Sequence, residues 1–188
     1  GHRLSTSGDS STASVGAPNA LTKRAAAIAE LITDRQLRVE YQPIVDAVKG
    51  TVVAIEALVR ASHPAYGPIE ASLLVHEAKR VDLLDLLTEQ VLEQAFEDYP
   101  RIVRAIPTVQ DVHVNVELGQ LARGGNKERL QRLCAENPGV KLTVEMTENS
   151  LNLAGEDVLA KLEELRASGV KVALDDFGQG YSTMLAIV

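Results

Sequence analysis

The sequence has little of several features that would define other classes of protein. A single cysteine, Cys134, excludes an internal disulfide and fits a reducing compartment such as the cytoplasm. Acidic residues outnumber basic ones by 26 to 19, so the net charge of −7 provides no general basic surface for a nucleic acid polymer. No apolar run approaches the roughly 20 residues of a membrane span, and no signal-peptide pattern is present. The composition, 45% hydrophobic and 24% charged over 188 residues, is typical of one globular domain.

The first 19 residues differ in composition from the rest of the chain. Gly1-His2 is interpreted as an expression-tag remnant, and residues 3–19 are rich in Ser, Thr and Gly without an apolar period. Because such a segment cannot bury a core, we expect a tag remnant and flexible linker over 1–19 and an ordered domain over 20–188. A linker here favours an upstream domain in the native protein, and a disordered N-terminus with nothing before it is the alternative.

Strand-like and helix-like segments alternate along the expected domain. Periodicity predicts strands over 37–46, 52–59, 111–118, 140–147 and 170–176, and helices over 22–34, 72–99 (in two segments, the second 84–99), 127–136 and 157–168. Gly169 follows the last helix, where a left-handed residue commonly ends one. This alternation favours parallel β/α units and a mostly parallel sheet.

Each predicted strand is aliphatic on one face and carries acidic or amide side chains on the other, near its carboxyl end. Members of this polar set are Glu40, Gln42, Glu56, His113, Asn115, Glu117, Glu145 and Asp175. A strand points alternate side chains to opposite faces, so these residues should share one face of the sheet. Unpaired buried carboxylates cost several kcal/mol each, so the group would need cations nearby. A solvated antiparallel face is the alternative, but it does not explain carboxylates concentrated at strand ends between helices.

A (β/α) barrel explains this pattern, because its active sites lie at the carboxyl ends of its strands. Oxygen ligands without clustered cysteine or histidine suit hard cations such as Mg²⁺ or Mn²⁺. The adjacent pair Asp175-Asp176 could serve two ions, which is a common device for cleaving phosphodiesters.

An ordered set of motifs from about Leu37 onward resembles the EAL family of bacterial cyclic di-GMP phosphodiesterases. The motifs are Tyr41-Gln42-Pro43-Ile44, Glu56-Ala57-Leu58-Val59-Arg60, His63-Pro64 with Gly67, Val114-Asn115, Val144-Glu145-Met146-Thr147-Glu148, and the run from Leu174 to Ser182 (LDDFGQGYS). The last run is the most specific. The resemblance implies an α/β fold, an incomplete TIM-like (β/α) barrel of the EAL type with mostly parallel strands, in the bacterial cytoplasm.

The resemblance also implies roles for individual residues. The first metal ion, Mg²⁺ or Mn²⁺, would be bound by Glu56, Asn115, Glu145 and Asp175, and the second by Asp176. Gln42 and Arg60 would contact the substrate, and Glu148 would steady the loop 177–182. With Glu56, Asp175, Asp176 and Glu148 as catalytic residues, the domain would hydrolyse one phosphodiester bond of cyclic di-GMP to give linear pGpG.

Each of three residues has a simpler interpretation. Arg60 could form a surface ion pair, and Glu148 could cap the following helix. His113 shares the interior face with Asn115, but a packed core histidine is favoured over a ligand.

The chain also departs from the family pattern. It ends at Val188, before the family's lysine in a Lys-x-Asp context and a later glutamate, so we expect the N-terminal two-thirds of an EAL domain with the last strands missing. This chain alone is expected to have little or no activity. Gln179, Lys79 and Glu117 stand where threonine, an acidic residue and serine are usual.

Two alternatives to the enzyme follow. One is a non-catalytic regulatory module that binds cyclic di-GMP, which the departures favour. The other is a protein-binding scaffold, which would not need the acidic set. The expected edge of strand 170–176 would be unpaired, which favours a homo-oligomer or domain-swapped assembly.

Overall fold

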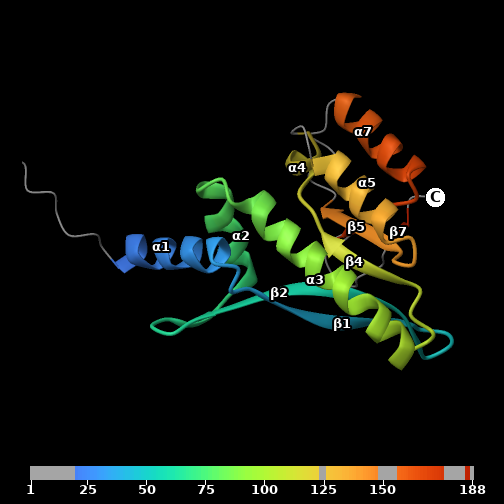
Figure 1. Ribbon diagram of the computed structural model, residues 1–188, viewed down its shortest axis with the longest axis horizontal. Helices are drawn as coiled ribbons and strands as arrows, with labels where there is room; N and C mark the ends of the chain where they lie inside the picture. Colours follow the sequence, from blue (N-terminus) through green and yellow to red (C-terminus); the bar gives the residue numbers. More distant parts are fainter. Residues whose placement is uncertain (1–19, 123–125, 148–155, 176–184, 187–188) are drawn as a thin grey trace, which may run out of the picture.

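The computed structural model describes residues 20–122, 126–147, 156–175 and 185–186. Its helices are α1 (Ala20–Thr33), α2 (Ala71–Arg80), α3 (Leu84–Ala105), α4 (Leu118–Ala122), α5 (Asn126–Glu136) and α7 (Glu156–Ala167). Its strands are β1 (Arg38–Asp46), β2 (Thr51–His63), β3 (Gly67–Ile69), β4 (Asp111–Asn115), β5 (Leu142–Thr147), β6 (Lys171–Asp175) and β7 (Leu185–Ala186). Helices α3, α5 and α7 follow one another across the strands (Figure 1). None of the described helices has both the length and the apolar character of a membrane span.

The strands form one sheet in the order β1-β2-β4-β5-β6-β7, with β3 paired to β2. Strands β2, β4, β5 and β6 are parallel, whereas β1 and β7 are antiparallel to their neighbours at the two ends. The expectation of an α/β fold with a mostly parallel sheet is confirmed. Among the described residues β1 and β7 are the ends of this order, so the sheet is open, as in an incomplete barrel.

The aliphatic strand faces pack against the helices and form the core. Val112 and Val144 are fully buried and Leu142 is nearly so, and these residues belong to one hydrophobic cluster with Leu87 and Val91 of α3. Burying one such side chain stabilises the fold by about 1.5–3 kcal/mol. The alternation of aliphatic and polar residues in the sequence therefore correctly predicts which strand face is turned towards the helices.

Several boundaries differ from the sequence prediction. Strand β2 continues to His63, so Glu56 lies within the strand and not near its carboxyl end. Antiparallel pairing with β1 and β3 extends β2 beyond Ala57, where its parallel pairing with β4 ends. Helix α3 continues through Pro100 to Ala105, because Ile102 and Val103 still pack against the core.

The other differences concern the third and last predicted strands. Strand β4 ends at Asn115, and Leu118 begins helix α4, which the sequence did not predict. Strand β7 pairs with Ala173 and Leu174 of β6, so the expectation of a wholly unpaired edge there is wrong.

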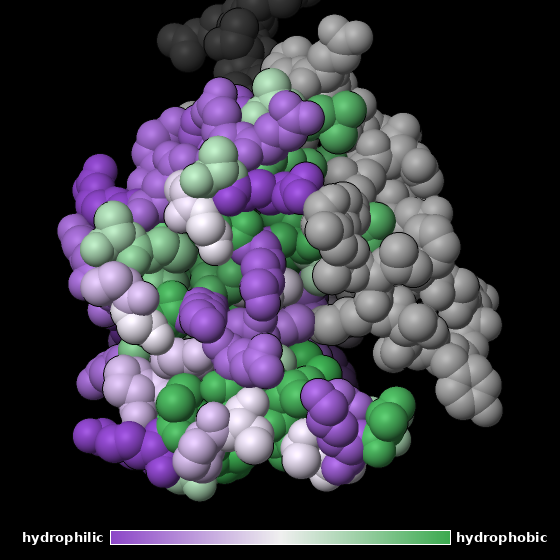
Figure 2. Space-filling model, turned by 90° about the vertical axis from the view of Figure 1, so that its right-hand side faces the viewer, coloured by the Kyte–Doolittle hydropathy of each residue, from purple (hydrophilic) through white to green (hydrophobic). Residues whose placement is uncertain are grey.

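Figure 2 views the molecule from the right-hand side of Figure 1, and polar and apolar residues are mixed on the surface seen there. An oligomer stays a prediction.

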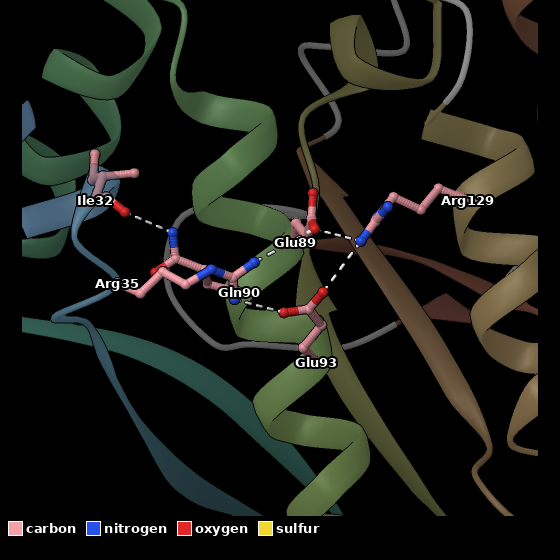
Figure 3. A network of polar contacts seen from close by, with 6 residues as sticks. All are labelled: Ile32, Arg35, Glu89, Gln90, Glu93 and Arg129. Carbon is pink, nitrogen blue, oxygen red and sulfur yellow. Dashed lines mark hydrogen bonds and ion pairs between the residues drawn. The ribbon is translucent and has the colours of Figure 1, made fainter.

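A polar network on the outside of the sheet ties α1 and α5 to α3 (Figure 3). It consists of Ile32, Arg35, Glu89, Gln90, Glu93 and Arg129. Glu93 accepts a bond of 2.8 Å from Arg35 and one of 3.1 Å from Arg129. The hydrogen bond from Arg35 holds the pKa of Glu93 below its usual value. One carboxylate thus connects the end of α1 to α5.

We expect Glu93→Ala to lower the free energy of unfolding by about 0.5–1 kcal/mol. The reason is that both ion pairs are lost, while their partial exposure to solvent keeps each contribution small. Urea unfolding followed by circular dichroism would measure the change. The control is Glu97→Ala, an exposed glutamate on the same helix outside this network. Equal changes in the two variants would contradict the prediction.

Candidate functional site

Neighbouring strands bring four of the predicted site residues to one face of the sheet. Gln42 of β1 lies directly opposite Glu56 of β2, and Asn115 of β4 lies beside Glu145 of β5. The Asn115 side chain donates a hydrogen bond from Nδ2 to Glu56 Oε1 at 2.8 Å. Parallel register between strands that are far apart in sequence therefore places Glu56, Asn115 and Glu145 together, as predicted.

Glu145 is the most buried member of this group, with 2% of its surface exposed. Its Oε1 lies 2.6 Å from His113 Nδ1, and His113 Nε2 lies 3.1 Å from Asp111 Oδ1. Burial lowers the pKa of His113, but the hydrogen bonds to Asp111 and Glu145 outweigh burial and raise this pKa to about 9. His113 is buried, as the sequence favours, and its two ring nitrogens also bridge two carboxylates.

Asp111 is a buried residue that the sequence analysis did not single out. Its Oδ2 accepts bonds from Lys171 Nζ at 2.6 Å and from Thr143 Oγ1 at 3.3 Å. Burial raises the pKa of Asp111, but the bonds from His113 and Lys171 outweigh it and lower the pKa below its usual value. The signal available in the sequence was the spacing Asp111-x-His113-x-Asn115, which places all three side chains on one strand face.

The remaining predicted residues are only partly described. Asp175 ends β6 with its backbone opposite Thr147, but its side chain lies outside the described residues. Asp176, Glu148 and Gln179 also lie outside them.

A cavity of about 550 Å³ adjoins the group of carboxylate and amide side chains. Arg60, Asn115, Glu117 and Glu145 line it together with apolar residues of β2 and α3. This volume is in the range of small-molecule sites, and such sites commonly combine apolar walls with a few polar groups. Arg60 also donates from Nε to Glu40 Oε2 at 2.9 Å, which is the ion pair that the simpler interpretation predicts.

Two departures from the family pattern form an ion pair with each other, and one of them, Glu117, lines the cavity. Lys79 Nζ of α2 lies 2.7 Å from Glu117 Oε1, just after β4. The two side chains are about half exposed, at 46% and 40%. The change at Glu117 therefore partly offsets the change at Lys79, although the two residues are 38 positions apart (117 − 79).

The donor set of Glu56, Asn115 and Glu145 fits a hard divalent cation. All three residues offer oxygen, and the bond from Asn115 to Glu56 uses the amide nitrogen, so the Asn115 amide oxygen can serve as a ligand. His113 contacts one oxygen of Glu145, and the carboxylate has a second to offer. In the part of the chain that the structure describes, no three His, Cys, Asp or Glu side chains form a complete metal-binding group by themselves. A cation here would therefore use Asn115 as well.

A parallel β/α sheet with carboxylates gathered on its interior face defines a barrel-type α/β domain with a candidate metal site. The EAL domain family matches residues 25–188, and the chain belongs to this family. The chain is 32% identical over 158 residues to the cyclic di-GMP phosphodiesterase NbdA of Pseudomonas aeruginosa, covering 82% of this chain and 20% of NbdA.

Two further comparisons concern another protein of the same organism, MucR. The chain is 31% identical over 153 residues to the bifunctional diguanylate cyclase/cyclic di-GMP phosphodiesterase MucR of Pseudomonas aeruginosa, covering 80% of this chain and 22% of MucR. A solved structure of the PaMucR phosphodiesterase in complex with c-di-GMP superimposes with a TM-score of 0.74 at 28% identity, over 84% of this chain and 65% of that one. The TIM-like barrel class is thereby confirmed. The chain spans about a fifth of the length of these two curated relatives.

The Lys79–Glu117 pair generates a prediction about stability. We expect Lys79→Glu to lower the free energy of unfolding by about 0.5–1 kcal/mol, because two like charges then face each other. The double variant Lys79→Glu/Glu117→Lys restores the pair with its signs exchanged and should recover most of the loss. Chemical unfolding of the wild type, the Lys79→Glu variant and the double variant measures this, and a double variant no more stable than Lys79→Glu would contradict it.

Proposed function

We propose that, in the full-length protein, this domain binds cyclic di-GMP and hydrolyses one of its phosphodiester bonds to give linear pGpG, using Mg²⁺ or Mn²⁺. The observation that carries the proposal is the meeting of Glu56, Asn115 and Glu145 from three neighbouring strands in a member of the EAL family. The relatives named as cyclic di-GMP phosphodiesterases support the choice of substrate.

The residues of the proposed site would have different roles in binding the cations. Glu56, Asn115, Glu145 and Asp175 would hold one cation, and Asp176 would hold a second. When bound, such cations neutralise the phosphate and lower the pKa of an attacking water. Donors that offer only oxygen favour hard cations over zinc.

Arg60 and Gln42 would bind the nucleotide. Arg60 lies on the cavity wall, where its guanidinium can donate hydrogen bonds to a phosphate. Gln42 is exposed and lies opposite Glu56, so its amide can contact the nucleotide beside the proposed cation. Glu148 would steady the loop 177–182.

A non-catalytic module that binds cyclic di-GMP is the second candidate. One observation favours it: Glu145 already has a hydrogen-bond partner in His113 at 2.6 Å, so its burial does not by itself require a cation. The two candidates bind the same ligand, but only the enzyme converts it to pGpG.

Calorimetric titration of cyclic di-GMP into the full-length protein tests both candidates. Titrations with Mg²⁺, Mn²⁺ or Ca²⁺, and with EDTA, are followed by chromatography of the same samples. The enzyme predicts cation-dependent binding and the appearance of pGpG with Mg²⁺ or Mn²⁺. Binding without pGpG supports the regulatory module, and the absence of binding under every condition contradicts both.

We expect Arg60→Ala to weaken cyclic di-GMP binding by about 10- to 100-fold while the affinity for Mn²⁺ stays unchanged. The reason is that a charge-assisted bond to phosphate contributes about 1.5–3 kcal/mol, whereas Arg60 is not a proposed metal ligand. Separate calorimetric titrations with Mn²⁺ and with nucleotide measure the two affinities. The control is Arg104→Ala, an exposed arginine in the last turn of α3 that does not line the cavity. Equal nucleotide affinity in the two variants would contradict the role of Arg60.

A further inference from the structure

A series of contacts between four ionisable side chains runs through the interior of the sheet and ends at Glu145. Lys171 Nζ lies 2.6 Å from Asp111 Oδ2, Asp111 Oδ1 lies 3.1 Å from His113 Nε2, and His113 Nδ1 lies 2.6 Å from Glu145 Oε1. Basic and acidic side chains alternate along this series. The four residues come from strands β4, β5 and β6, so this series of contacts crosses the parallel part of the sheet.

The contacts with Asp111 and Glu145 fix the orientation of the imidazole ring of His113. Both ring nitrogens are engaged, one by each carboxylate, so the ring cannot turn without losing a contact. Asp111 is itself fixed by Lys171 and Thr143, which lie side by side on β6 and β5. Asp111 and His113 are both buried, so water does not readily replace these bonds.

Glu145 depends on His113 for its orientation. It is 2% exposed, and among the described side chains His113 donates the one hydrogen bond found to its carboxylate. Its register neighbour on β6 is Ala173, whose methyl group has no hydrogen-bonding capacity and leaves space on that side. The contact with His113 therefore largely determines the direction in which Glu145 presents its second carboxylate oxygen.

We propose that His113 is a positioning residue, which Asp111 holds in place so that Glu145 presents its free oxygen to a divalent cation. This inference rests on the proposed function, because it takes Glu145 as a metal ligand. Partners that orient a metal ligand commonly change metal affinity by 10- to 100-fold when they are replaced. His113 contacts no cation in this scheme and acts only through Glu145.

Two substitutions of His113 separate the two ring contacts. His113→Asn keeps an N–H donor at the position of Nδ1, which faces Glu145, whereas His113→Gln keeps one at the position of Nε2, which faces Asp111. We expect His113→Gln to weaken Mn²⁺ binding by about 10- to 100-fold. His113→Asn should stay closer to the wild type, because the donor to Glu145 is retained.

Calorimetric titration of Mn²⁺ into the full chain measures these affinities directly, without relying on activity. Thermal unfolding of each variant shows that it is folded at the temperature of the titration. A purely structural histidine would lower the unfolding temperature in both variants and leave the Mn²⁺ affinity unchanged, and that result would overturn the inference. Asp111→Asn adds a further test, since it should weaken Mn²⁺ binding although Asp111 is not a proposed ligand.

Glu145→Gln distinguishes this inference from the proposed function. If the wild type binds Mn²⁺, Glu145→Gln loses it and His113→Gln keeps it unchanged, then the metal site stands and the positioning role of His113 is wrong. If the wild type binds no Mn²⁺, then the proposed metal site is wrong and the inference is overturned together with it.

Discussion

The buried carboxylate of Glu145 is the constraint on which the polar interior of this sheet depends. A charge withdrawn from water costs several kcal/mol unless its partners compensate it. His113 compensates Glu145, Asp111 compensates His113, and Lys171, whose side chain is 58% exposed, connects the series to solvent. These contacts require β4, β5 and β6 to keep one register. A slip of one residue would exchange the polar and aliphatic faces of a strand and leave the charges without partners.

The alternation of residue types is enough to predict which side chains share the interior face, because a strand points alternate residues to opposite sides. It places Glu56, Asn115 and Glu145 on one face, and the structure brings Glu56 and Asn115 into contact across 59 positions of sequence. Alternation does not define where a residue lies along its strand. Glu56 is predicted near a strand end, yet β2 continues to His63, because antiparallel pairing on both sides extends it. The length of a strand depends on its neighbours as well as on its own residues.

The contacts that the sequence does not reveal are those that depend on register between distant segments. Lys171 and Asp111 are 60 positions apart, and nothing local to either residue indicates the other. Lys79 and Glu117 are a second example. Taken from the sequence they are two separate departures from the EAL pattern, and each counts against the site. In the structure the two residues form an ion pair. The negative charge that Glu117 adds therefore partly offsets the change from an acidic residue to a lysine at position 79.

The ion pair of Arg60 with Glu40 does not compete strongly with a role for Arg60 in binding phosphate. The two side chains are 37% and 56% exposed, and ion pairs so accessible to water contribute at most about 1 kcal/mol. A bond from a guanidinium to a phosphate contributes about 1.5–3 kcal/mol, so exchanging one partner for the other is favourable. The surface ion pair of Arg60 is therefore compatible with the proposed phosphate contact.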